Sequence, residues 1–117
     1  MISVRMAAIC VAAAVLGSTS VMADDVRLSG EEIKQIVIGH KMNAVSPKGK
    51  KWSAVYAADG TAEWSDGATG TWRLDGDLFC DFPKGDKEYC SNILKTGENA
   101  YHFQRGDGRK GSTFSLE

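Results

Sequence analysis

The sequence predicts a mainly β protein of the α+β kind: a small antiparallel β-meander or barrel of six to eight strands with one short N-terminal helix. Turn-forming residues recur about every ten residues after Gly39, which is the spacing of an antiparallel meander. Between the turns, apolar and polar residues alternate, as in strands with one buried and one wet face. A capping motif that begins at Ser29 predicts the helix.

The first 23 residues have the composition of a secretion signal. Arg5 gives a positive start, Met6 to Leu16 form an apolar run, and small or compact residues lead up to Ala23. We therefore expect residues 1–23 to be a signal peptide and residues 24–117 to be a single β-rich domain, periplasmic or secreted. The apolar run is about half as long as a bilayer span requires, so we expect no transmembrane segment in the mature chain.

The composition after residue 23 limits the classes of partner that we expect. Thirteen basic and 15 acidic side chains remain once Arg5 is removed, and this near-neutral balance argues against nucleic acid as a partner. All ten aromatic residues follow the leader, and each can bury a large area in a small core. We expect a folded monomer without a cofactor.

The predicted helix runs from Ser29 to Ile38. Ser29 and Glu32 have the spacing of a capping box, in which the hydroxyl accepts from the Glu32 amide and the carboxylate reaches back to Ser29. Gly39 is a natural stop. Because so short a helix must be held by packing, we expect it to cover one opening or face of the barrel. The stretch from Asp24 to Arg27 is expected to be a loose start.

The strand pattern is clearest at the aromatic residues. Asp59-Gly60 is a tight-turn pair that separates two β-like runs. Residues that share a face in the alternation are Trp52 with Ala54 and Tyr56, Trp72 with Leu74, and Tyr101 with Phe103. One face of the sheet is therefore expected to be buried.

Two of the three cysteines are expected to form a disulfide. If Phe82 to Glu88 closes a hairpin, Cys80 and Cys90 lie directly opposite each other on neighbouring strands. This register puts Cys90 on the face opposite Ile93, so either a bulge or a disulfide on the outer face is required. A redox-active pair is the alternative, but the spacing differs from a C-x-x-C motif.

The titratable residues give no clear active site. His40 and His102 are the only histidines, and His102 is expected on the polar face of a strand, so no metal site is predicted. Carboxylates cluster at one hairpin, where a pair could do acid and base work, but Asp75 and Asp59 each precede a glycine and are explained by turn chemistry. No nucleophile is marked by its surroundings, and no enzyme is predicted.

Lysines and tryptophans offer two contact surfaces. Lys48, Lys50 and Lys51 form a basic cluster, which either supports solubility or docks an acidic partner. The tryptophans are expected in the core, although rings lining a ligand pocket would give the same pattern. Trp64 is the least certain of the three, because its neighbours Glu63 and Ser65 are polar.

The order of these features resembles a family of small exported alphaproteobacterial proteins that is classed as a domain of unknown function. The resemblance covers nearly all of the mature chain and implies a leader, one helix, a β-meander and a disulfide; the family brings no established activity. The segments that carry it are Leu28-Ser29-Gly30-Glu31-Glu32-Ile33, Tyr56-Ala57-Ala58-Asp59-Gly60-Thr61, Gly70-Thr71-Trp72-Arg73, Gly76-Asp77-Leu78-Phe79-Cys80, Cys90, Tyr101-His102-Phe103 and the glycine-rich turn before Thr113-Phe114.

These observations favour a non-catalytic, inhibitor-like binding module of the cell envelope, whose partner is an envelope protein or a glycan. At the level of fold it resembles the barrel-shaped periplasmic lysozyme inhibitors. The residues expected to contact the partner are Lys48, Lys50, Lys51, Trp64 and His102. The alternative is a carrier of a lipid or an aromatic metabolite. Between the two, we expect a barrel with this many aromatic side chains to be filled rather than hollow.

Overall fold

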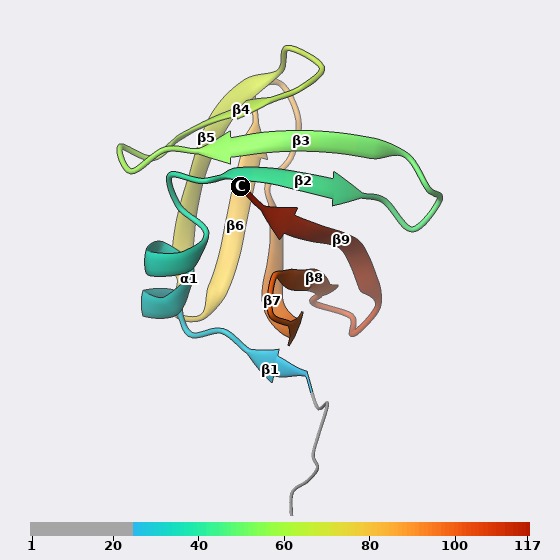
Figure 1. The fold of residues 1–117 in the computed structure, drawn as a ribbon. Coiled ribbons are helices and arrows are strands. Elements are labelled where there is room, and N and C mark those ends of the chain that lie inside the picture. Colours follow the sequence, from blue (N-terminus) through green and yellow to red (C-terminus); the bar gives the residue numbers. More distant parts are fainter. Residues whose placement is uncertain (1–24) are drawn as a thin grey trace, which may run out of the picture.

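The computed structural model describes residues 25–117, which form a closed antiparallel barrel of eight strands, with one short helix and one extra strand (Figure 1). Each barrel strand pairs with the next in the chain, and the last returns to pair with the first. The barrel strands are β2 (Lys41–Val45), β3 (Lys51–Tyr56), β4 (Thr61–Trp64), β5 (Thr69–Asp75), β6 (Leu78–Pro83), β7 (Tyr89–Gly97), β8 (Ala100–Arg105) and β9 (Lys110–Leu116). The predicted fold class is confirmed.

The predicted signal peptide lies outside the described residues and stays a prediction. In the described part of the chain, no helix has both the length and the apolar character that crossing a bilayer requires.

Helix α1 (Gly30–Ile36) begins with the predicted capping box. Ser29 Oγ accepts from the Glu32 amide at 3.1 Å, and Glu32 Oε1 accepts from the Ser29 amide at 2.8 Å. The helix ends two residues earlier than predicted, and Gly39 then turns the chain into β2 with a φ of 89°. Only glycine adopts this backbone angle without strain.

The helix closes one end of the barrel, as the sequence predicts. Ile33 and Val37 are fully buried against the core. The Gly30 amide donates to Asp77 Oδ1 at 2.9 Å, and this bond ties the start of α1 to the β5–β6 turn. The backbones approach so closely here that a Cβ on Gly30 would collide with the carbonyl oxygen of Gly76.

The segment before the helix is ordered, contrary to the expectation of a loose start. Strand β1 (Val26–Arg27) pairs antiparallel with β7, and the Leu28 amide donates to the Ile93 carbonyl at 2.8 Å. The Leu28 side chain is buried in the core. The pairing of β1 with β7 places Leu28 over the core, so the segment just before the helix has a structural role.

The half of the barrel nearest the helix is filled by side chains. Tyr56, Phe79 and Met42 are almost completely buried, and the rings of Tyr56 and Phe79 meet edge to face with centroids 4.8 Å apart. Tyr101 and Phe114 stack across β8 and β9 at 5.1 Å. The expectation of a filled interior therefore holds for this half, whereas the opposite end is hollow, as described below.

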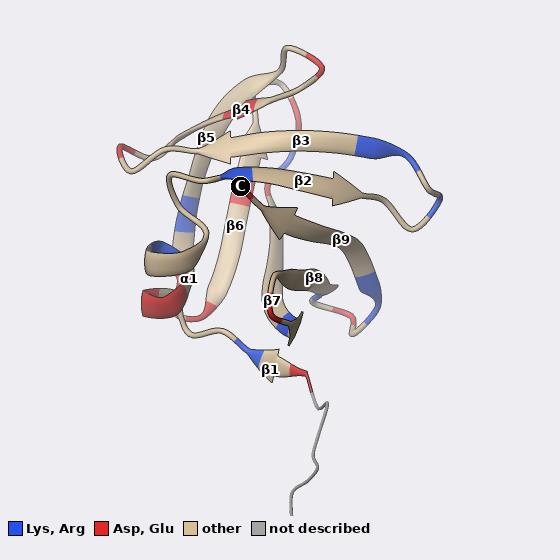
Figure 2. Ribbon diagram, in the orientation of Figure 1, with Lys and Arg blue, Asp and Glu red and all other residues tan. Residues whose placement is uncertain are grey.

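Charge is unevenly distributed between the two ends of the barrel (Figure 2). We call the open end the mouth; its loops and their flanking residues are 46–51, 65–68, 84–88 and 105–110. These segments carry eight basic residues and four acidic ones. The basic ones are Lys48, Lys50, Lys51, Lys84, Lys87, Arg105, Arg109 and Lys110. The first turn of α1, at the closed end, is acidic, so the mouth is the end that attracts anions.

Candidate functional site at the barrel mouth

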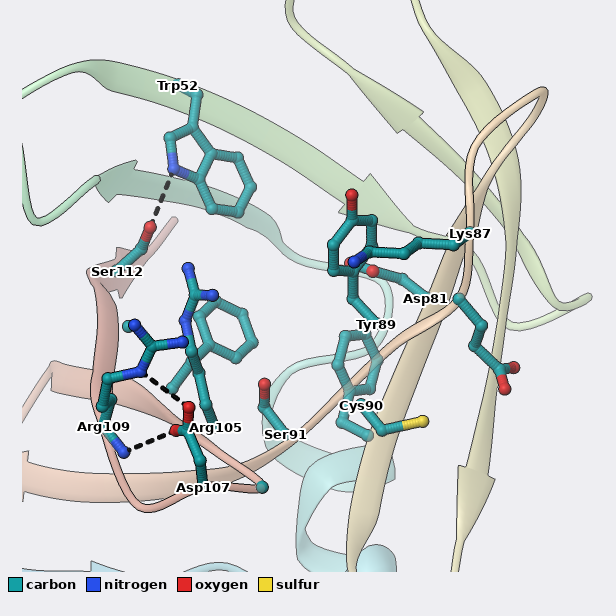
Figure 3. A pocket seen from close by; sticks show the side chains of 15 residues that line it. Trp52, Asp81, Lys87, Tyr89, Cys90, Ser91, Arg105, Asp107, Arg109 and Ser112 are labelled. Carbon is teal, nitrogen blue, oxygen red and sulfur yellow. Dashed lines mark hydrogen bonds and ion pairs between the residues drawn. The ribbon is translucent and has the colours of Figure 1, made fainter.

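A cavity of about 440 Å³ opens at the mouth of the barrel (Figure 3). Its walls come from β3, β6, β7, β8 and β9, and from the β6–β7 and β8–β9 loops. A volume of this size is typical of sites for small molecules, which fall between about 300 and 1,000 Å³. We call it the mouth pocket.

Three aromatic rings line the inner part of the mouth pocket. Trp52 stacks on Phe103 with centroids 6.4 Å apart and planes inclined by 16°, and Phe103 stacks on Phe79 at 6.2 Å. The Trp52 indole N–H donates to Ser112 Oγ at 3.1 Å, which fixes the ring. Every second residue of β3 points inward, so Trp52 lies on the same face as Ala54 and Tyr56. The inner wall is a preformed apolar surface for a flat ligand.

One carboxylate, that of Asp81, lies inside the barrel and lines the pocket. The Tyr56 hydroxyl donates to its Oδ2 at 3.0 Å. Burial raises the pKa of Asp81 to about 6, although the hydrogen bond from Tyr56 opposes part of this rise. Burial, followed by the negative charge of Asp81, also raises the pKa of Tyr56 well above its ordinary value. Asp81 can therefore accept a hydrogen bond from a ligand on the β6 side of the pocket.

The outer rim of the pocket is basic. Arg105, Arg109 and Lys87 line it, together with the carboxylates of Asp107 and Glu88, and Glu88 is held by Arg73. Arg109 holds Asp107 twice, through its backbone amide at 3.0 Å and its Nε at 2.7 Å. These contacts keep the pKa of Asp107 below its ordinary value, and Arg105 adds to the effect. The pocket thus has an apolar wall, the carboxylate of Asp81 on its β6 side and guanidinium groups at its entrance.

The disulfide joins Cys80 and Cys90 outside the barrel. The two residues are direct cross-strand partners with Cα atoms 4.0 Å apart, so the predicted pairing is confirmed. Phe79 and Asp81 point inward, so Cys80 between them points outward; of the two predicted solutions, the outer face is correct. Arg73 pairs with Cys80 across β5 and β6, and its Nε donates to Glu88 at 2.8 Å, so an ion pair lies beside the disulfide.

One group of possible metal ligands occurs in residues 25–117, formed by Cys80, Cys90 and Glu88. Both sulfur atoms of this group are already joined to each other in the disulfide. The cluster is therefore explained as a structural bridge beside an ion pair.

The predicted contact residues do not form one site. Lys48 and Lys50 are exposed in the β2–β3 hairpin and Lys51 is exposed at the start of β3, all at the mouth. Trp64 is half-buried and meets the edge of Tyr56 at 6.0 Å. These four residues lie around the open end, but outside the lining of the mouth pocket.

His102 is placed differently from the prediction of an exposed strand residue. It does point to the outer face of β8, but only 6% of it is exposed, because the chain at β1 covers it. Its Nε2 lies 3.2 Å from Asp25 Oδ2. The sequence contains no signal for this burial, since the covering segment is remote in the chain.

The residues that line the pocket include several that the sequence analysis did not single out for binding. Arg105 and Arg109 flank Gly106-Asp107-Gly108, the glycine-rich turn before Thr113-Phe114, to which the sequence analysis assigned no binding role. Asp81, which lies within β6, was likewise assigned no binding role. The available signal was a carboxylate inside a run of apolar residues, with Phe79 two positions before it and Phe82 directly after it.

A second hollow, of about 610 Å³, lies on the outer surface of β4 and β5 and is lined by Thr61, Gly70 and Phe82 among others. Phe82 is 44% exposed there. Lys84 and Glu63 are its charged residues. The mouth pocket combines three stacked rings with converging charged groups, which is the more usual composition of a ligand site.

The fold and the pocket define a closed eight-stranded antiparallel barrel with one covered end and one open end. Comparison with protein-family models, with curated proteins and with solved structures found no match for this chain.

Proposed function

We propose that this protein is a small-molecule binding module that holds an amphipathic ligand in the mouth pocket. The single observation that carries the proposal is the cavity of about 440 Å³ at the open end of the barrel, with Trp52, Phe79 and Phe103 in its wall. Of the two functions considered from the sequence, the geometry favours the ligand carrier over the inhibitor-like module.

The ligand's body lies against the rings, and one of its polar groups meets Asp81. A planar or aromatic group would stack on Phe103 and Trp52, which are already nearly parallel at 16°. A hydroxyl or amine of the ligand would donate to Asp81, whose partner Tyr56 occupies only one of its acceptor positions. Stacking contributes affinity and the hydrogen bond contributes orientation.

We propose a binding role rather than a catalytic one. Three polar groups that line the pocket are engaged in positioning: Ser112 accepts from Trp52, Asp81 accepts from Tyr56 and Asp107 binds Arg109. Such pairs hold a wall rigid, as a binding site requires.

We also propose that the protein acts in the periplasm or outside the cell. The Cys80–Cys90 disulfide supports this location, because disulfides persist in oxidising compartments. The proposal agrees with the predicted leader.

A second candidate function is contact with an acidic envelope protein or a glycan through the β2–β3 hairpin. The observation that favours it is the exposure of Lys48 and Lys50 at the tip of this hairpin. A Lys48→Gln, Lys50→Gln variant that lost a detected partner, while small-molecule binding stayed intact, would support this second function.

Titration with N-phenyl-1-naphthylamine, a neutral aromatic dye that fluoresces in apolar sites, tests the main proposal. We expect saturable binding that Phe103→Leu weakens, because this substitution removes the central ring of the wall. Phe82→Leu is the matched control, since Phe82 lies on the outer face away from the pocket. Absence of saturable binding, or equal weakening by both variants, would overturn the proposal.

A further inference from the structure

We propose that Arg105 and Arg109 form an oxyanion subsite at the entrance of the mouth pocket, so that the ligand carries a carboxylate, sulfonate or phosphate group beside its apolar body. This inference rests on the proposed function, because it assigns the chemistry of the outer end of the same pocket.

The two arginines are placed on one face by the β8–β9 hairpin. The Arg105 amide donates to the Arg109 carbonyl at 2.8 Å, so the two residues close the hairpin as a cross-strand pair. Side chains of such a pair project from the same face of the sheet. In Figure 3 both extend from the hairpin into the mouth, on the side where Ser112 lies.

Both arginines also line a groove of about 450 Å³ outside the mouth, together with Lys48 and Lys110. They therefore stand between the outer groove and the inner pocket. A ligand bound in the pocket would have its outer end beside both guanidinium groups, within a rim that is basic on each side.

The local charges are not balanced. Asp107 binds Arg109 through Nε, and in the part of the chain that the structure describes Arg105 pairs with no carboxylate. Of the other carboxylates that line the pocket, Glu88 is held by Arg73 and Asp81 accepts from Tyr56. Asp107 therefore serves both guanidinium groups, and Lys48 and Lys110 add positive charge nearby. Guanidinium groups present several N–H donors in a planar fork that suits an oxyanion.

The β6 side of the pocket fixes the direction of the ligand. Asp81 lies there, across the pocket from the hairpin that carries the arginines, and its carboxylate repels an anion that would enter in the reverse orientation (Figure 3). The outer end, with an uncompensated guanidinium group, attracts the same anion. An amphipathic anion thus has one favourable orientation, with its charge at Arg105 and its apolar body against the rings.

Two dyes that differ by one group test the subsite. 1-Anilinonaphthalene-8-sulfonate is the sulfonated counterpart of N-phenyl-1-naphthylamine, so the pair isolates the effect of the anion. Each is titrated into the protein and into Arg105→Gln, Arg109→Gln and Arg105→Lys variants. Lys34→Gln is the matched control, because it removes the same charge from α1 at the closed end.

We expect Arg105→Gln to weaken binding of the sulfonated dye about fivefold, which is the upper end of the range for an exposed charge pair. Binding of the neutral dye should change less than about twofold. Arg105→Lys should retain part of the affinity that Arg105→Gln loses, and Lys34→Gln should leave the affinity for both dyes unchanged. The sulfonated dye should also bind more weakly as salt rises, because exposed charges are screened.

Two results would overturn parts of this account separately. If the neutral dye binds but the arginine substitutions change both dyes equally, the oxyanion subsite is wrong and the pocket stands. If neither dye binds saturably, the proposed function itself fails.

Discussion

The Tyr56 hydroxyl donates to Asp81 Oδ2 at 3.0 Å inside the barrel, where β3 and β6 face each other across the interior. This pair marks the boundary between the two halves of the interior. Tyr56 belongs to the filled half, where it is fully buried, and Asp81 lines the open pocket. A buried hydroxyl needs an acceptor, and the buried carboxylate supplies it.

Asp81 makes the stability of the barrel depend on pH. Its pKa is about 6 when folded and about 3.9 in an unfolded chain, so protonation of Asp81 stabilises the fold. This contribution is complete below about pH 4 and is lost as pH rises through about 6. Asp81→Asn keeps an acceptor for Tyr56 without the charge, so it should be more stable than the parent at pH 7.5, by on the order of 2 kcal/mol.

Urea unfolding of the parent and Asp81→Asn at pH 4.0 and pH 7.5 checks this prediction. The quantity to compare is the difference in unfolding free energy between the two proteins at each pH. Other carboxylates such as Glu88 have lowered pKa values and change the stability of both proteins in the opposite direction. Parallel pH dependences of the two proteins would show that Asp81 is not buried as described.

Replacing both cysteines should lower the stability of the protein without abolishing ligand binding in the mouth pocket. The bridge spans ten residues along the chain, and closure of such a loop contributes about 2 to 3 kcal/mol in the chain-entropy view. Because the bridge lies outside the barrel, Cys80→Ser, Cys90→Ser should still bind N-phenyl-1-naphthylamine. Unfolding with and without reductant measures the effect. Equal sensitivity of the parent and the variant to reductant would contradict the disulfide.

The closed end should not tolerate a side chain at Gly30. Alanine is the better helix former, yet its Cβ would collide with the Gly76 carbonyl oxygen, so Gly30→Ala should destabilise the protein by about 1 to 3 kcal/mol. Gly106→Ala is the matched control, because no atom lies within 4 Å of the position that its Cβ would occupy. Thermal unfolding of both variants compares them. A neutral Gly30→Ala would mean that α1 packs less closely than described.

Local chemistry made much of the fold predictable. The capping box at Ser29 and the positive φ at turn glycines such as Gly60 are specified within a few residues. The pairing of Cys80 with Cys90 followed from the centre of one hairpin. Each of these features depends on neighbours in the chain, which the sequence displays directly.

Features that depend on remote contacts were not predictable in the same way. Closure of the barrel pairs Ala44 with Phe114, and no short pattern in either strand specifies the other as its partner. The burial of His102 likewise depends on Asp25 and β1, which come from the opposite end of the chain. An outward-facing residue is expected to be wet unless another segment covers it, and the sequence does not show that segment.

The mouth pocket was missed for a related reason. Alternation correctly placed Trp52 inside the barrel, but an inward ring fills a core or lines a cavity with the same sequence pattern. Whether space remains beside the ring depends on residues of other strands, such as Gly111, where a Cβ would lie only 3.2 Å from the Cβ of Phe103. Arg105 and Arg109 came together only because the hairpin pairs them.

The central claim is that the open end of the barrel holds a small ligand, and NMR mapping tests it most directly. N-phenyl-1-naphthylamine is titrated into ¹⁵N-labelled protein and the amide and indole signals are followed. We predict that shifts concentrate at the Trp52 indole N–H and at the amides of Ser91, Phe103 and Gly111, with α1 unchanged. Shifts confined to Thr61, Gly70 and Phe82, or no saturable shift at all, would contradict the account.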